Sequence, residues 1–254
     1  MLNNLPSPLL AALVAVVAFL YSSVGFGGAT GYLAAMSQFG IEPVRMASAA
    51  LVLNILVAGV SFFNYARAGH LDKKLLLSFL FTSIPAAFLG GYFHLAAGVY
   101  YLLLYAVLTY VMLTMLFSRK ETVDEAARLR PFPSWLALVC GAGIGLLSGM
   151  VGIGGGVFLS PLIILARWGT SKQAAATAAG FILLNSVSGL LGRLLGGNLV
   201  LDSFCITLLP VAILGALAGS YFGARHFSSL WTRRILGVVL LVAIVNFAVG
   251  YWGK

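Results

Sequence analysis

Two runs of glycine are the residues best placed to do chemistry in this chain, because each interrupts an apolar stretch. The runs recur 127 residues apart and consist of Gly25, Gly27 and Gly28, then Gly152, Gly154, Gly155 and Gly156. Adjacent glycines break a helix, and a helix that restarts after them, at about Ala29 and Val157, has N–H groups without intrahelical partners. Such a helix start is positive and favours an oxyanion. The spacing therefore predicts two amide-lined halves of one anion site.

Polar side chains inside apolar stretches are the second group of candidates, since they are costly in a membrane. Four of them recur at matching positions in the two halves of the chain and are Ser48, Asn54, Thr177 and Asn185. Hydrogen bonds between helices would explain these four as well as contact with a substrate would. Ser23 and Ser148 border the glycine runs and could donate hydroxyls, although serine more often bonds back to its own helix. With hinge residues 25–29 and 152–156, these six complete the candidate substrate-binding set.

The remaining reactive residues carry no signature of an enzyme. Cys140 and Cys205 lie in apolar segments without the spacing of a metal site, and the three histidines are far apart. There is no GxxxxGK[ST] phosphate-binding loop. Ser148-Gly149 has no partner histidine at mid-membrane that would make it a protease. We therefore expect no catalysis, no metal and no cofactor.

Composition identifies the class of protein. Apolar residues make up 61% of the chain and charged residues 8%, whereas soluble proteins are about one quarter charged. Crossing a bilayer takes roughly 20 helical residues. Six stretches have that length and lie near 46–66, 74–95, 98–117, 173–195, 203–224 and 230–251. The sequence predicts an all-α, polytopic membrane protein whose partner is the lipid bilayer; the net charge of +9 is scattered, which does not suit nucleic acid.

Two longer apolar stretches, 9–39 and 135–167, contain the glycine runs. If each turned back at its glycines, twelve basic residues would share one side of the membrane, namely Arg67, Lys73, Lys74, Arg119, Lys120, Arg128, Arg130, Arg167, Lys172, Arg225, Arg233 and Arg234. Single crossings would split them, against the positive-inside rule. We therefore expect re-entrant pairs of half-length helices, with both termini outside; ten full spans would give the same sides and stay an alternative. No basic segment precedes the first stretch, so we expect no cleaved signal peptide.

The duplication predicts the domain organisation. Residues 1–118 form repeat 1 with its hinge at 25–29, residues 119–134 a cytoplasmic linker, and residues 135–254 repeat 2 with its hinge at 152–156. Three crossings per repeat would turn the second repeat upside down relative to the first. Inverted-topology repeats are typical of secondary transporters, whose substrate site lies at the repeat interface near the midplane.

Other glycines and arginines have simpler interpretations. Six glycines form small-xxx-small ladders that predict helix packing and are Gly141, Gly145, Gly149, Gly215, Gly219 and Gly223. Arg45 and Arg193 would face the sparsely charged outer side, and we expect them to lie in loops or to extend to the membrane surface. An outward-facing arginine could also attract an anion to the vestibule of the transporter.

The second half of the chain resembles a known family. The segment GLLSGMVGIGGGVFLSPL at residues 145–162, followed by Ala176-Thr177, resembles the signature of the TauE/SafE sulfite exporter family. The resemblance implies a bacterial or archaeal inner-membrane carrier of sulfite or of organosulfur anions such as sulfonates, coupled to a gradient of protons or sodium ions. Ala29 stands where the second run has Gly156, so the first hinge has one freely turning amide fewer.

Three functions fit these observations. The leading hypothesis is a secondary carrier for a small sulfur oxyanion. An anion channel could use the same hinges, and a membrane scaffold that transports nothing is the third. The sequence leaves open whether the chain forms a homo-oligomer.

Overall fold

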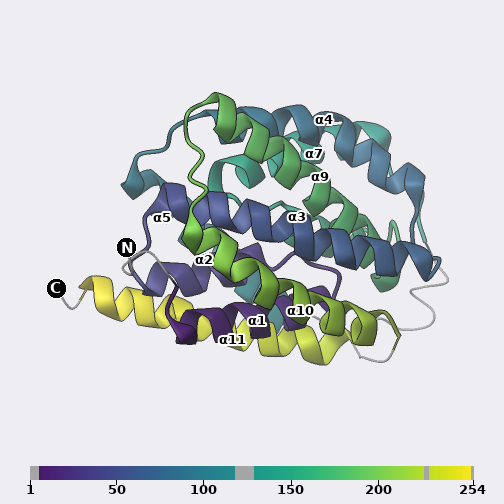
Figure 1. The fold of residues 1–254 in the computed structure, drawn as a ribbon. Coiled ribbons are helices and arrows are strands. Elements are labelled where there is room, and N and C mark those ends of the chain that lie inside the picture. Colours follow the sequence, from purple (N-terminus) through teal and green to yellow (C-terminus); the bar gives the residue numbers. More distant parts are fainter. Residues whose placement is uncertain (1–5, 118–128, 226–228, 253–254) are drawn as a thin grey trace.

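Helices are the only regular elements in residues 6–117, 129–225 and 229–252, which are the residues that this computed structural model describes (Figure 1). They are α1 (Pro8–Ser22), α2 (Ala29–Gln38), α3 (Pro43–Arg67), α4 (Lys73–Tyr92), α5 (Ala97–Leu116), α7 (Ser134–Val151), α8 (Gly156–Leu165), α9 (Ser171–Leu195), α10 (Ser203–Arg225) and α11 (Ser229–Trp252). Six of them, α3, α4, α5, α7, α9 and α10, are apolar and long enough to cross a membrane. The predicted all-α, polytopic membrane fold is confirmed.

Local sequence explains where several helices begin. The Ser7 hydroxyl accepts a hydrogen bond from the Leu10 amide at the start of α1, and the Asp72 carboxylate accepts one from the Leu75 amide at the start of α4. Thr170 and Gln173 form a capping box at the start of α9. Each cap satisfies N–H groups that would otherwise lack a partner.

The second glycine run turns the chain back toward the end from which it came. The Arg130 amide, just before α7, donates a hydrogen bond of 2.8 Å to the carbonyl of Arg167, just after α8. With ten residues, α8 is about 15 Å long and too short to cross a bilayer. α7 and α8 are therefore the two arms of a helical hairpin.

The first glycine run does the same. The Thr30 hydroxyl, at the start of α2, donates a hydrogen bond of 2.8 Å to the Tyr21 hydroxyl near the end of α1. One residue later, a Cβ on Gly31 would meet the side chains of Val17 and Tyr21, so α2 runs back along α1. Like α8, α2 has only ten residues.

The expectation that all four arms have half the membrane's length is wrong for α7. This helix has 18 residues and extends about 27 Å. An isolated glycine such as Gly149 is tolerated inside a helix that is packed. α7 continues to Val151 and ends at Gly152, whose φ of +89° is left-handed. Each hairpin consequently has one long arm and one short arm.

The two glycine ladders join the hairpins to other helices. Added Cβ atoms would collide with carbonyl oxygens of the facing helix in six pairs: Gly141 with Phe79, Gly145 with Ser83, Gly149 with Ala87, Gly215 with Ala15, Gly219 with Phe19, and Gly223 with Ser23. The predicted packing role of these glycines is confirmed. From one pair to the next along each interface, the residue numbers increase on both helices. α7 therefore runs parallel to α4, and α1 runs parallel to α10. Each long arm thus packs against a helix from the other half of the sequence.

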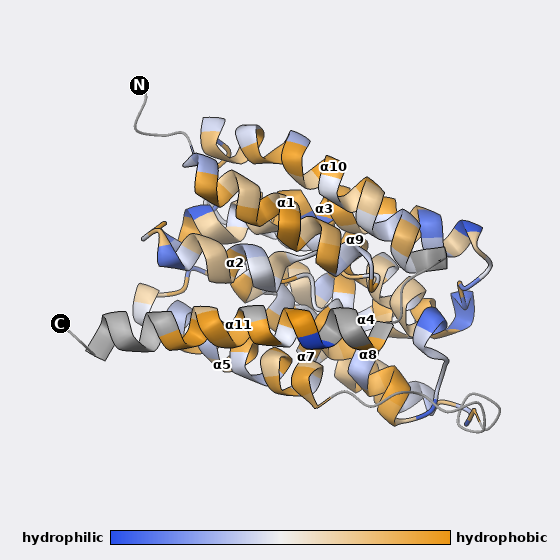
Figure 2. Cartoon of the chain, turned by 90° about the horizontal axis from the view of Figure 1, so that it is seen from below, coloured by the Kyte–Doolittle hydropathy of each residue, from blue (hydrophilic) through white to orange (hydrophobic). Residues whose placement is uncertain are grey.

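Hydrophilic residues lie mostly at the two ends of the helices, and hydrophobic residues cover the helix bodies (Figure 2). We call the end of the molecule at which α3 ends the Arg67 end, and the end at which α9 ends the Arg193 end. Lys172, at the start of α9, donates a hydrogen bond of 2.7 Å to the Gly223 carbonyl and lies over the Tyr65 ring, so it belongs to the Arg67 end with Arg130 and Arg167. Most of the predicted linker, residues 118–128, lies outside the described residues, as does Lys254.

Candidate functional site

Positive backbone angles make the two hinges alike. Gly25 and Gly28 have φ values of +82° and +92°, and Gly152 and Gly155, 127 residues later, have +89° and +80°. Other residues adopt this region only with strain, which explains the glycines. Gly28 and Gly155 are the N-caps of α2 and α8, and neither helix start has a side-chain cap. Both short arms therefore begin deep in the protein with free, positively polarised N–H groups.

The hinges differ at two positions. Gly154 has a φ of +72°, whereas its counterpart Gly27 does not have a left-handed backbone. A Cβ on Gly156 would lie 2.5 Å from Ile182 and 2.8 Å from the carbonyl oxygen of Ala178, while Ala29 accommodates its methyl group at the first position of α2. The two hinges therefore differ at Ala29 and Gly156, where their sequences differ, and also at Gly27 and Gly154, where both have glycine.

Both hinges approach the same two side chains at the middle of the molecule. A Cβ on Gly27 would meet the Asn54 amide and Ile182, and a Cβ on Gly154 would lie 2.6 Å from Ile182 Cγ2 and 2.8 Å from Asn54 Nδ2. Asn54 lies midway along α3, and Ile182 lies midway along α9. We call this set of four residues the hinge centre.

The tips of the hairpins extend past the hinge centre in opposite directions. Gly25 contacts Ala175 near the start of α9, and Gly152 contacts Ala47 near the start of α3. The first hairpin thus reaches toward the Arg67 end and the second toward the Arg193 end. Each tip lies against the central helix of the other half of the sequence.

Unpartnered polar atoms gather at the hinge centre. Asn54 is fully buried, and neither its Oδ1 nor its Nδ2 has a hydrogen-bond partner among the described residues. The Ser186 hydroxyl is also buried without a partner and lies 3.0 Å from the position of a Cβ on Gly154. Ser148 and Tyr32, which contact the N-cap glycines Gly155 and Gly28 respectively, have buried hydroxyls without partners as well. Buried polar groups are normally paired, so this concentration points to a site.

The other polar candidates have different surroundings. Ser48 faces the loop after α9, where its hydroxyl donates to the Val44 carbonyl and accepts from the Val200 amide. Ser23 donates to the Leu20 carbonyl, which is the back-bonded arrangement common for serine. Thr177 and Asn185 are fully buried without partners on α9.

Sequence reasoning missed Tyr32, Ile182 and Ser186. The repeat alignment matched Asn54 with Asn185, but the hinge glycines contact Ile182 instead, so the apolar isoleucine occupies the place opposite Asn54. The signal for Ser186 was available, since it adjoins Asn185 and lies one helical turn from the residue that faces the hinges.

Known proteins resemble this chain over nearly its whole length. The family model described as Sulfite exporter TauE/SafE matches residues 10–247. The chain belongs to the TauE/SafE family. It is 36% identical to a probable membrane transporter protein of Sinorhizobium fredii over 230 residues, 90% of this chain and 92% of the relative. A second protein of that name, from Methanocaldococcus jannaschii, is 26% identical over 74% of this chain and 72% of its own. No solved structure matches significantly.

Membership establishes a membrane transporter of the TauE/SafE type. In the described part of this chain, the two hinges interrupt the regular helices of the membrane-spanning region. At the hinges the backbone N–H groups of Gly27, Gly28, Gly154 and Gly155 make no hydrogen bond to a backbone carbonyl of the described residues. Neutral donors of this kind can hold an anion without a fixed positive charge.

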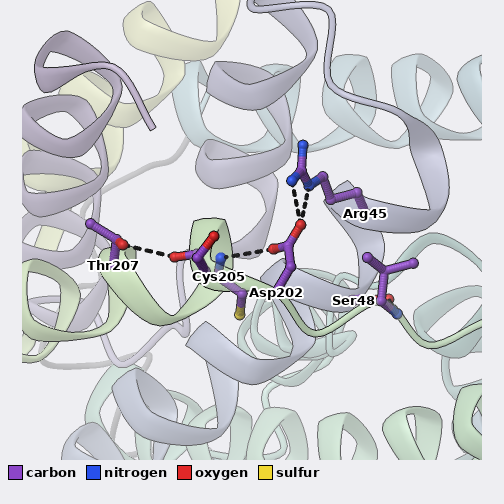
Figure 3. Close-up of polar contacts among 7 residues, drawn as sticks. Arg45, Ser48, Asp202, Cys205 and Thr207 are labelled. Atoms are coloured by element: carbon purple, nitrogen blue, oxygen red, sulfur yellow. Dashed lines mark hydrogen bonds and ion pairs between the residues drawn. The ribbon is translucent and has the colours of Figure 1, made fainter. Parts of the chain in front are cut away.

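The two arginines of the Arg193 end have different surroundings in this TauE/SafE chain. Arg45 is half-buried and paired with Asp202, its Nε lying 2.7 Å from Oδ2, as Figure 3 shows. Arg193 does not extend to the surface as expected, since only 5% of it is exposed. Its Nη2 donates to the carbonyls of Gly149 and Met150, at 3.2 and 2.8 Å. Carbonyls at the end of α7 carry partial negative charge, which draws the cation inward.

Proposed function

We propose that this TauE/SafE transporter is a secondary carrier that moves sulfite, or a related small organosulfur oxyanion, through the hinge centre. The observation that carries the proposal is the fully buried side-chain amide of Asn54, which lies between Gly27 and Gly154 and has no hydrogen-bond partner in the part of the chain that the structure describes. The family name supports sulfite as the first substrate to test.

Neutral donors suit an anion that must be released. The starts of α2 and α8 offer backbone N–H groups, and Asn54 and Ser186 offer an amide and a hydroxyl. In the dry interior of a protein these dipoles interact with a charge more strongly than in water. A lysine or arginine at the same place would hold the anion more tightly and slow its release.

Alternating access is supported by the opposite directions of the hairpins. One tip contacts Ala175 near the Arg67 end and the other contacts Ala47 near the Arg193 end. We infer inverted-topology repeats at residues 1–118 and 135–254, joined by the 119–134 linker. Both hinges are buried, so one set of helices must move to admit substrate from either end.

The positive-inside rule supports an orientation in which the Arg67 end faces the cytoplasm and the termini face outward. The membrane would be the inner membrane of a bacterium or archaeon. We infer coupling to a proton or sodium gradient and no catalytic activity. The chain would need no cofactor and no nucleic acid.

Transport by the purified protein in liposomes tests the proposal. We expect uptake of radiolabelled sulfite to saturate with concentration and to show counterflow when unlabelled sulfite is trapped inside. Ohmic single-channel currents would show that the protein is an anion channel and not a carrier. A protein that neither moves nor is thermally stabilised by sulfite, sulfate, thiosulfate, sulfoacetate or taurine would point to a scaffold.

A further inference from the structure

A small cavity opens at the Arg193 end, apart from the hinge centre. Its lining includes Tyr100, Met150, Arg193 and Asn198. Met150 lies two residues before Gly152, the tip of the second hairpin. The cavity is therefore next to the backbone that connects this end with the hinge centre.

Arg193 brings an uncompensated charge to this cavity. Its hydrogen bonds to the described residues come from Nη2 and go to neutral carbonyls, and its buried Nε has no partner. Within residues 6–117, 129–225 and 229–252, no carboxylate forms an ion pair with Arg193. The ion pair at this end of the molecule joins Arg45 to Asp202. Burying a cation without an anion is strongly unfavourable.

Two other lining side chains, those of Tyr100 and Asn198, already donate hydrogen bonds to the backbone. The Tyr100 hydroxyl donates a hydrogen bond of 3.1 Å to the Val151 carbonyl. Asn198 donates through Nδ2 to the Tyr92 carbonyl at 3.0 Å. His94 also lines the cavity but is exposed, so Arg193 is the buried lining residue that still has a charged donor to offer a ligand.

The first half of the chain makes the same backbone contact without a charge. Tyr65, 128 residues before Arg193, donates its hydroxyl to the carbonyl of Ser23, 127 residues before Met150, at 2.9 Å. Each contact ties the end of a long arm, α1 or α7, to α3 or α9 of the same half of the sequence. Because a neutral hydroxyl suffices at the Arg67 end, holding the carbonyl does not explain why the other end uses an arginine.

We propose that Arg193 and its cavity form an access site that binds the small oxyanion between solution and the hinge centre. This inference rests on the proposed function, because the anion it receives is the one carried. The positive charge of Arg193 attracts the anion at this end of the molecule. The anion then moves to the neutral hinge centre and binds there.

Sulfite uptake into proteoliposomes of uniform orientation, with sulfite added at the Arg193 end, tests this site. Arg193→Gln keeps a hydrogen-bond donor but removes the charge. We expect it to raise KM for sulfite about ten-fold or more, the size expected for a lost charged hydrogen bond. Arg193→Lys should keep KM within a few-fold of wild type. Arg45→Gln, which removes an arginine already paired with Asp202 at the same end, is the matched control and should leave KM unchanged.

The ionic-strength dependence gives a second measurement, which does not depend on the folding of Arg193→Gln. For wild type and Arg193→Lys, KM at the Arg193 end should rise with salt as the attraction is screened. Unchanged KM in a stable Arg193→Gln, or a wild-type KM independent of salt, would overturn the access site. Wild-type protein that transports neither sulfite nor any of sulfate, thiosulfate, sulfoacetate and taurine would instead overturn the proposed function.

Discussion

Asn54 shows how a single residue can reveal a site. Its side-chain amide is fully buried in the middle of α3, yet neither the oxygen nor the nitrogen of that amide has a hydrogen-bond partner among the described residues. Leaving a buried polar group unpaired costs about 1–3 kcal/mol. A leucine of similar size would avoid this cost, so stability alone does not account for asparagine there.

Replacing Asn54 with leucine should separate stability from transport. We expect Asn54→Leu to unfold at the same temperature as wild type or higher, because an unpaired amide is removed, while sulfite uptake falls about ten-fold or more. Asn198→Leu is the contrasting variant, since the Asn198 amide donates to the Tyr92 carbonyl, and it should lower the unfolding temperature. Thermal unfolding and uptake into liposomes would be measured together; wild-type uptake by Asn54→Leu would remove Asn54 from the site.

The hinge glycines allow a test of geometry. Gly154 and Gly197 both have left-handed backbones, with φ of +72° and +69°, but an added Cβ meets Ile182, Asn54 and Ser186 at Gly154 and open space at Gly197. Alanine at either position should cost about 1–2 kcal/mol of backbone strain. We expect Gly154→Ala to abolish sulfite uptake and Gly197→Ala to retain it. Equal uptake by the two variants would argue against a substrate site beside Gly154.

At the scale of elements, the glycine ladders decide how the long arms are held. α7 meets α4 through three glycines on α7 and through Gly90 on α4, whereas α1 meets α10 through glycines that lie on α10. Both interfaces reach close packing of backbones through small residues. A helix whose glycines fill such an interface gains from contact more than it loses in helix propensity.

Two glycines on α7 provide a matched pair for this interface. A Cβ on Gly145 would collide with the Ser83 backbone, but one on Gly143 would meet nothing within 4 Å. We expect Gly145→Ala to lower the unfolding temperature in detergent because α7 must move away from α4. Gly143→Ala should raise stability by up to about 1 kcal/mol through helix propensity. A tolerated Gly145→Ala would show that the α4–α7 contact is looser than this packing requires.

At the scale of the whole molecule, the hairpins determine which loops share a side. The hydrogen bond between the backbones of Arg130 and Arg167 joins the two ends of the second hairpin. An arrangement with eight simple crossings would place these residues on opposite sides of the membrane.

Cysteine labelling can test that arrangement. In a variant without Cys140 and Cys205, single cysteines at Arg130 and Arg167 should react with an impermeant maleimide from the same side, and a cysteine at Arg45 from the other. The double variant Arg130→Cys, Arg167→Cys should also form a disulfide under mild oxidation, since the two backbones are in contact. Labelling of Arg130→Cys and Arg167→Cys from opposite sides would refute the hairpin.

Sequence by itself determined the features that depend on local chemistry. Apolar length predicts most of the crossings, because the bilayer requires it. Repeated glycines mark the two hinges, since adjacent glycines cannot sustain a helix, and the spacing of Gly141, Gly145 and Gly149 indicates close packing. The signature at 145–162 indicates the family, and the family model confirms it.

Tertiary structure alone decided which side chains meet. Counting along the chain matched Asn54 with Asn185, but helix rotation and hairpin depth place Ile182 opposite Asn54. Arg193 looked like a surface arginine because its partners, the carbonyls of Gly149 and Met150, are more than 40 residues away and invisible to local pattern. Contacts between distant segments depend on how the helices pack together, whereas hydropathy and backbone breaks are properties of neighbouring residues.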